Sequence, residues 1–213
     1  MFLVLLAAGC GSSKPAESLP SPTSSPDEEP TAGAPLAASP SDGRPIILAF
    51  GDSLTAGSGL PPGSGYPEML QAELDGRGYK YRVVNAGIGG DTTGGGLARL
   101  KAALDMHPAV VILELGGNDG LRGIPVDTMQ SNLDEMTAAF QKSGATVILA
   151  GITLPRNFGP DYIAAFEKVY PTIATKYKVT LIPFLLEGAA GRPELNLEDG
   201  IHPNQAGYRI VTA

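Results

Sequence analysis

Short apolar runs alternate with amphipathic helical patterns from residue 46 to the end of the chain. The apolar runs are five to seven residues long and rich in β-branched side chains, as expected for buried strands. They occupy residues 46–50, 81–85, 109–115, 146–151 and 179–183. Between them, apolar residues recur every three or four positions, which places them on one helical face. These faces comprise Tyr66, Met69, Leu70 and Leu74; Leu97, Leu100 and Leu104; Val126, Met129, Leu133, Met136 and Phe140; and Tyr162, Phe166, Val169, Tyr170 and Ile173.

This alternation of strands and helices predicts an α/β fold. Strands that are apolar on both faces and separated by helices form parallel sheets with helices packed on either side. We therefore expect a three-layer α/β/α sandwich built on a five-stranded parallel sheet.

Polar and glycine-rich segments follow the predicted strands. Residues 51–57 read GDSLTAG, residues 86–93 read AGIGGDTT, residues 116–120 read GGNDG, and residues 198–204 read EDGIHPN. Because ligands bind outside the carboxyl ends of the strands in open parallel sheets, these loops are the expected location of the chemistry.

One serine and one histidine in these loops suit nucleophilic catalysis. A serine hydroxyl needs a neighbouring base to accept its proton, and imidazole is the usual base near neutral pH. His202 is on the loop edge, whereas His107 precedes the third strand and lies at the opposite edge. Asp199 can fold back onto the ring of His202 and fix its tautomer. The predicted catalytic residues are therefore Ser53, His202 and Asp199.

Attack on an acyl carbon creates an oxyanion, which requires hydrogen-bond donors positioned in advance. The backbone N–H of Ser53 is one candidate donor. The N–H of Gly90, in a loop whose glycines allow close backbone approach, is a second, and the side-chain amide of Asn118 is a third.

The four loop segments resemble, in order and spacing, the four sequence blocks of the SGNH hydrolase (GDSL esterase) family. The resemblance extends over residues 46–213 and is closest to the bacterial arylesterases, lysophospholipases and thioesterase I. It implies a flavodoxin-like SGNH hydrolase fold and the same roles for Ser53, Gly90, Asn118, His202 and Asp199. The implied reaction is hydrolysis of carboxylic ester or thioester bonds through an acyl-enzyme on Ser53, without metal or organic cofactor.

The resemblance also implies features around the substrate. Residues 119–125 are expected to form a mobile loop beside an acyl pocket lined by Leu154 and Pro155. The implied substrate is a small-molecule or lipid ester. Asp52 is interpreted as a turn-forming residue, and the segment is not the nucleophile elbow of the larger α/β-hydrolase class, because Thr55 replaces the final glycine.

Composition and charge exclude several other functions. The 213 residues carry a formal net charge of -7 without any run of Lys or Arg, which argues against nucleic acid as a partner. Cys10 is the single cysteine, so disulfide frameworks, CxxC redox pairs and thiolate zinc clusters are excluded. Two histidines do not suffice for a His-rich metal site. We expect a monomer.

The N-terminal segments predict export and anchoring. Residues 1–10 form an apolar run ending in Ala-Ala-Gly-Cys, which resembles the lipobox of bacterial lipoproteins and makes Cys10 the expected lipidation site. Residues 11–45 contain eight prolines and no aromatic residue, which is typical of a disordered linker. The predicted hydrolase domain is 46–213, with its C-terminal helix truncated. A secreted, membrane-tethered bacterial lipoprotein is expected, either periplasmic or extracellular.

Three other functions are alternatives to this one. A nucleotide-binding protein is disfavoured, because the chain has no P-loop sequence and its glycine-rich segment follows the second strand. A carbohydrate O-acetylesterase acting on cell-wall or extracellular polysaccharide would use the same catalytic residues. A non-catalytic, surface-tethered carbohydrate-binding module would have lost one of them.

Overall fold

The computed structural model describes residues 42–213. The predicted lipobox-like segment 1–10 with Cys10, and nearly all of the predicted linker 11–45, lie outside the described residues. Predictions about them stay predictions.

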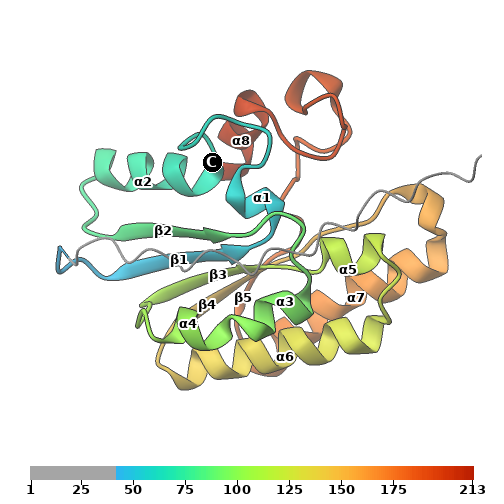
Figure 1. Cartoon of the computed structure of the whole chain (residues 1–213), viewed down its shortest axis with the longest axis horizontal. Helices are drawn as coiled ribbons and strands as arrows, with labels where there is room; N and C mark the ends of the chain where they lie inside the picture. The colour runs from blue at the N-terminus through green and yellow to red at the C-terminus, as the bar shows by residue number, and fades with distance from the viewer. Residues whose placement is uncertain (1–41) are drawn as a thin grey trace, which may run out of the picture. The chain divides into compact units, whose positions relative to one another are not determined.

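A parallel sheet of five strands forms the centre of the fold (Figure 1). Its strands are β1 (Ile46–Gly51), β2 (Arg82–Gly87), β3 (Val110–Glu114), β4 (Thr146–Ala150) and β5 (Thr180–Ile182), arranged in the order β2-β1-β3-β4-β5. Every neighbouring pair is parallel. The predicted fold class is confirmed, and each strand overlaps the apolar run that predicted it.

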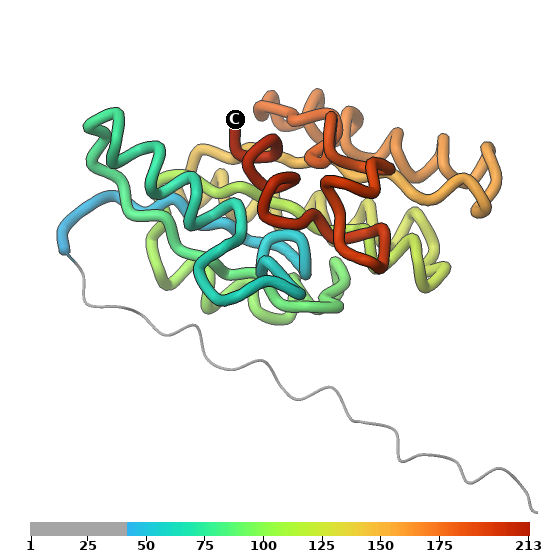
Figure 2. The backbone as a smooth tube through the Cα atoms, turned by 90° about the horizontal axis from the view of Figure 1, so that it is seen from above, coloured from blue at the N-terminus to red at the C-terminus, as the bar shows by residue number. Residues whose placement is uncertain are grey.

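Helices cover both faces of this sheet. On one face lie α2 (Tyr66–Gly76) and α8 (Gln205–Thr212), which pack against each other. On the other face lie α3 (Thr93–Ala98), α4 (Leu100–Leu104), α6 (Val126–Lys142) and α7 (Pro160–Tyr177). Figure 2, turned by 90°, shows α2 and α8 side by side above the sheet. The short helices are α1 (Ser53–Ala56), α5 (Gly117–Leu121) and the 3-10 turns η1 (Arg156–Phe158) and η2 (Pro193–Leu195).

The core lies between the central strands and the helices. Leu48 and Leu113 are fully buried, as β1 and β3 have neighbours on both sides. Phe50 of β1 meets Phe140 of α6 edge to face, with ring centroids 5.6 Å apart. Such edge-to-face pairs add to the stability of the packing between helix and sheet. The carboxyl end of β1 therefore packs against α6.

Two local predictions need correction. The pattern Leu97, Leu100 and Leu104 predicts one helical face, but the backbone leaves helical geometry at Arg99 and divides it into α3 and α4. The side chain of Arg99 turns to the strand ends, where it forms the contacts described below. The predicted loop 119–125 begins inside α5, and its first residue, Asp119, is buried and accepts from the N–H of Thr93 over 2.8 Å.

Within residues 42–213, no helix combines the length and the apolar character that crossing a bilayer requires.

Candidate active site

Ser53 lies at the carboxyl end of β1, where the chain turns into α1. Asp52 caps this short helix, and its carboxylate accepts from the N–H of Leu54 over 3.0 Å. Gly57 ends the helix in the left-handed region, at φ 73°, which favours glycine. The turn holds the half-buried Ser53 at the loop edge of the sheet, as the sequence predicts.

A chain of hydrogen bonds connects Ser53 to His202 and Asp199. Nε2 of His202 lies 2.8 Å from Oγ of Ser53, and Nδ1 lies 2.6 Å from Oδ2 of Asp199. The other carboxylate oxygen of Asp199 accepts from the backbone N–H groups of Ile201 and His202, over 2.9 and 3.0 Å. These bonds fix the orientation of the imidazole and the direction in which it can accept a proton. The structure thus brings together the three residues predicted to be catalytic.

The carboxyl group of Asp199 is adapted to remain ionised. Desolvation raises its pKa, but hydrogen bonds from the N–H and the ring of His202 and from the N–H of Ile201 outweigh that effect. The result is a pKa lowered from 3.8 to about 2. An ionised carboxylate can stabilise the imidazolium that forms when His202 takes a proton.

The segment that carries His202 is attached to the rest of the fold on both sides. The N–H of Leu197 donates to the carbonyl of His202 over 2.8 Å, and Asn204 caps α8 by accepting from two backbone N–H groups. The hydroxyl of Tyr208 on α8 donates to the carbonyl of Leu54 on α1 over 2.8 Å. This last bond ties the helix that follows His202 to the helix that begins at Ser53.

Two of the predicted oxyanion donors have a free N–H. Within residues 42–213, the backbone N–H groups of Ser53 and Gly90 donate to no acceptor. Gly90 lies after β2 with φ 75°, and its carbonyl accepts from the guanidinium of Arg122 over 2.8 Å. Both N–H groups are thus available to a ligand.

The third predicted donor, Asn118, is already engaged on both of its amide hydrogens. Its Nδ2 donates to Oδ2 of Asp52 over 3.0 Å and to the carbonyl of Asp91 over 2.9 Å. An oxyanion would have to share or replace one of these acceptors. The structure therefore places Asn118 among the site loops but shows it held by the protein.

Arg99 is a residue of the site region that the sequence did not reveal. Its guanidinium donates to Asp91 over 2.8 Å and to the carbonyls of Ala86 and Gly51 over 2.8 and 2.9 Å. It also lies 3.8 Å from the ring centroid of Phe50. One side chain thereby connects the ends of β1 and β2 to the Asp91 loop, in a planar arrangement that suits arginine.

Glu114 is the second residue that sequence reasoning missed. It ends β3, is fully buried, and its Oε2 accepts from the hydroxyl of Thr55 over 2.9 Å and from the N–H of Asp52 over 3.3 Å. Burial raises the pKa of Glu114 well above its ordinary value, and the negative charge of Asp52 raises it further. Burial also raises the pKa of Asp52 to about 6. A charged residue at the end of an apolar strand was the available signal.

The predicted substrate residues lie in different environments. Leu154 is buried against Gly120 and Phe166, whereas Pro155 is exposed and precedes η1. Their contact with substrate stays a prediction. His107 lies before β3, as expected from the sequence, with φ 50°.

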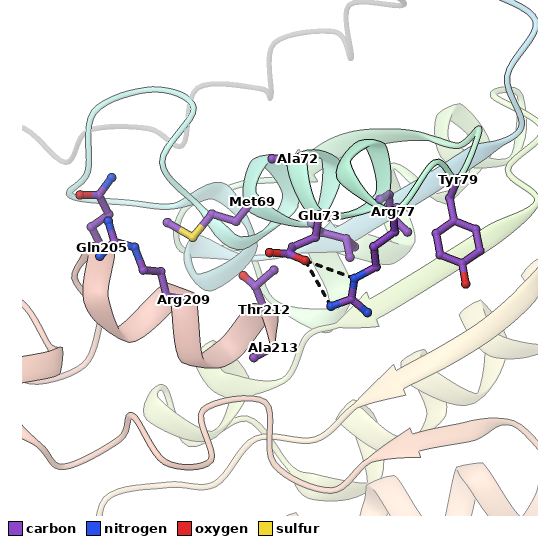
Figure 3. A pocket seen from close by; sticks show the side chains of 11 residues that line it. Met69, Ala72, Glu73, Arg77, Tyr79, Gln205, Arg209, Thr212 and Ala213 are labelled. Carbon is purple, nitrogen blue, oxygen red and sulfur yellow. Dashed lines mark hydrogen bonds and ion pairs between the residues drawn. The ribbon is translucent and has the colours of Figure 1, made fainter.

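A groove of about 750 Å³ lies elsewhere, between α2 and α8 (Figure 3). Met69, Leu74 and Tyr79 line it together with Arg209, and Glu73 forms an ion pair with Arg77 at 3.2 Å along its side. None of the predicted site residues lines this groove. Among residues 42–213, no three His, Cys, Asp or Glu side chains are grouped so that they could hold a metal ion.

Comparison with known proteins gives consistent matches. The sequence profile of the GDSL-like lipase/acylhydrolase family matches residues 49–210. Esterase TesA of Pseudomonas aeruginosa is 50% identical over 158 residues, which is 74% of this chain and 79% of TesA. The arylesterase of Vibrio mimicus is 44% identical over 158 residues, with the same shares covered. Thioesterase 1/protease 1/lysophospholipase L1 of Escherichia coli is 40% identical over 160 residues, or 75% of this chain and 76% of that protein.

Solved structures agree with these matches. The crystal structure of TesA superposes with a TM-score of 0.76 at 48% identity. The match covers 78% of this chain and 93% of the TesA chain in that structure. The psychrotrophic esterase EstA from Pseudoalteromonas, inhibited by monoethylphosphonate, superposes with a TM-score of 0.75 at 36% identity, covering 78% and 92%. The similarity thus extends over nearly all of the described fold.

Proposed function

Because the chain belongs to the GDSL-like lipase/acylhydrolase family, we propose that it hydrolyses carboxylic esters or thioesters through an acyl-enzyme on Ser53. Carboxylic ester hydrolysis itself is the activity shared by relatives that are 40% to 50% identical to it. The observation that carries the mechanism is the 2.8 Å hydrogen bond between Ser53 and His202, whose ring is in turn held by Asp199.

In the acylation step, Oγ of Ser53 attacks the carbonyl carbon and its proton passes to Nε2 of His202. The carbonyl π bond opens and leaves a negative charge on oxygen. When that π bond re-forms, the bond to the leaving alcohol or thiol breaks, and the leaving group takes the proton from Nε2. Water then attacks the acyl-enzyme and passes a proton to Nε2 of His202. The bond between the acyl carbon and Oγ of Ser53 breaks, Oγ takes that proton, and the acid is released.

The negative oxygen of each intermediate needs donors that are in place beforehand. The N–H groups of Ser53 and Gly90 are free to donate to it. The amide of Asn118 joins them by exchanging one of its present acceptors for the oxyanion. A donor of this kind contributes about 10²–10³ in rate.

The proposed substrates are small aryl esters, lysophospholipids and acyl thioesters. This follows the names of the relatives, which are an esterase, an arylesterase and a thioesterase/lysophospholipase. A carbohydrate O-acetylesterase would use the same chemistry on a different acyl group and alcohol.

The test is turnover of p-nitrophenyl esters of graded acyl length by the purified chain, by Ser53→Ala and by Ser131→Ala. Ser131 is exposed on α6, so its variant controls for the substitution itself. We expect Ser53→Ala to lose at least about 10³-fold in kcat/KM and Ser131→Ala to keep it. Equal turnover by Ser53→Ala and the unaltered chain would refute the acyl-enzyme. Activity confined to acetyl esters would favour the O-acetylesterase.

We further propose that the chain is secreted as a monomer and tethered through a lipid on Cys10. The support is the lipobox resemblance of residues 1–10, followed by a proline-rich spacer. Metabolic labelling with a palmitate analogue should tag the full chain but not Cys10→Ala. Labelling of both, or of neither, would contradict the anchor.

A further inference from the structure

Glu114 is a buried ionisable group that the reaction above does not use. It ends β3 opposite Gly51 of β1, and a β-carbon at Gly51 would lie 2.6 Å from Oε2 of Glu114. The glycine before the Asp52 turn therefore leaves space for this side chain. Such a carboxyl group, fully buried beneath the nucleophile loop, is costly unless all of its polar atoms find partners.

The hydrogen bonds of Glu114 account for only one of its two oxygens. Oε2 accepts from Thr55 and from the N–H of Asp52, whereas Oε1 is buried and accepts from no donor within residues 42–213. An ionised Glu114 would leave Oε1 unsatisfied. A protonated Glu114 can donate instead, and the neighbouring residue with a carboxylate to accept is Asp52, whose N–H donates to Oε2 over 3.3 Å.

The surroundings favour one proton on this pair. Burial raises the pKa of Glu114 well above its usual range, and burial raises that of Asp52 only to about 6. Two neighbouring buried carboxyl groups cannot both ionise without strong repulsion, and the directions of the two pKa shifts favour the proton on Glu114. The other ionisable groups near the pair are Tyr66 of α2, Tyr170 of α7, Tyr208 of α8, His202 and Arg99.

Asp52 connects Glu114 to the site through hydrogen bonds of its carboxylate. One of its oxygens accepts from the N–H of Leu54 and so caps α1, and the other accepts from Nδ2 of Asn118. A second negative charge beside Asp52 would displace its carboxylate from both donors. The position of the oxyanion donor thus depends on the protonation state of its neighbour.

We propose that Glu114 is a positioning residue for ester hydrolysis: as a neutral acid it donates to Asp52, whose carboxylate then holds the amide of Asn118. This inference rests on the proposed function, because Asn118 matters only if an oxyanion forms at Ser53. It adds to the site a residue of β3 that does not touch the substrate.

Two substitutions distinguish the effect of the donated hydrogen bond on kcat from the effect of side-chain volume. Glu114→Gln keeps an acceptor for Thr55 and an N–H donor for Asp52, so kcat should stay within about threefold. Glu114→Leu has a similar volume but no donor, so kcat should fall at least about tenfold while KM changes less than about threefold. Glu135→Gln, an exposed substitution on α6, serves as the control.

The pH profile gives a readout that packing alone would not change. A carboxyl group with a raised pKa keeps its proton at low pH and loses it as the pH rises through the raised value. The unaltered chain should therefore lose kcat on the alkaline side, and Glu114→Gln should retain it to higher pH. At neutral pH, the infrared carbonyl band of a protonated carboxyl group should disappear in Glu114→Gln and persist in Glu135→Gln.

The possible results distinguish the two proposals. Turnover that survives in Ser53→Ala defeats the proposed function, whereas the infrared band is measured without turnover and tests Glu114 alone. The role of Glu114 is overturned by full kcat in Glu114→Leu, by equal losses in both Glu114 variants, or by absence of the band. If Glu114→Leu does not fold, the pH profile and band of Glu114→Gln decide.

Discussion

The side-chain amide of Asn118 donates to the backbone carbonyl of Asp91 over 2.9 Å, which joins α5, the short helix after β3, to the loop after β2. Asp91 is itself held by the guanidinium of Arg99. Asn118 therefore has its orientation fixed before any substrate arrives. When the oxyanion replaces one of its present acceptors, the amide donates from a position that the protein already holds, and such a preplaced donor stabilises a developing charge.

Replacing Asn118 should accordingly affect the chemical step. We expect Asn118→Ala to lower kcat by about 10²–10³ with little change in KM, because the lost donor acts on the oxyanion. Steady-state kinetics on a p-nitrophenyl ester measure both constants. Asn157→Ala, on the exposed turn η1, is the matched control and should retain kcat. Unaltered kcat in Asn118→Ala would remove this residue from the oxyanion site.

Arg99 should contribute to stability because its planar guanidinium donates to three acceptors at once. Lysine cannot donate at once to Asp91 and to the carbonyls of Ala86 and Gly51. We expect Arg99→Lys to lower the free energy of unfolding by about 2–4 kcal/mol, as measured by urea denaturation. Arg77→Lys is the comparison, since the exposed pair of Arg77 with Glu73 should contribute only about 0–1 kcal/mol. Similar losses in both variants would contradict the role of Arg99.

Asp199 predicts a specific response to acid. Its pKa is lowered from 3.8 to about 2 in the folded state, so its stabilising contribution is present above pH 3.8 and is lost as the pH falls toward 2. In Asp199→Asn, the melting temperature should depend less on pH in this window. The same variant should lose about 10²–10⁴ in kcat, because the ring of His202 loses its ionised partner.

The neighbouring Glu198→Gln provides the comparison for Asp199. No hydrogen bond connects the side chain of Glu198 to His202 in the described part of the chain, and Glu198 is exposed. Its variant should keep both kcat and the acid response. An equal effect of the two substitutions would show that general charge, and not the bond to His202, is responsible.

Gly116 should not tolerate a side chain. Its φ of 121° is rarely adopted by other residues, and a β-carbon would lie 2.5 Å from the hydroxyl of Tyr170. We expect Gly116→Ala to lower the free energy of unfolding by more than about 2 kcal/mol. Gly123→Ala has left-handed geometry in open space, so it should cost only about 1 kcal/mol. Equal costs in urea denaturation would mean that close packing at Gly116 is unimportant.

The parts of the fold that the sequence predicts are those set by local periodicity. The strands are predicted because a strand buried on both faces is an apolar run, as in residues 110–113 of β3. The division between α3 and α4 was not found, because Arg99 is drawn out of the helix by carbonyls of distant strands. Helical periodicity contains no information about such partners.

In the site, too, some residues can be predicted from local sequence, whereas others depend on contacts between distant segments. Ser53, Gly90, Asn118 and His202 could be selected because their chemistry is recognisable and the ends of parallel strands meet at one edge. Glu114 is marked in the sequence only as a charged residue at the end of an apolar strand, which does not by itself indicate a role. Its significance comes from contacts across β1, with Asp52 and Thr55, that exist only after the sheet has paired.

The shared direction of the five strands also affects how such a protein can diversify. Each loop at the reactive edge begins from its own strand, so insertions in the loop between β4 and α7 leave the pairing of β1 with β3 unaltered. The sequence of this segment can therefore change while the nucleophile keeps its place. Directed libraries confined to the exposed residues 155–157 should yield many folded variants, and their turnover of esters of different acyl length tests whether this segment affects selectivity.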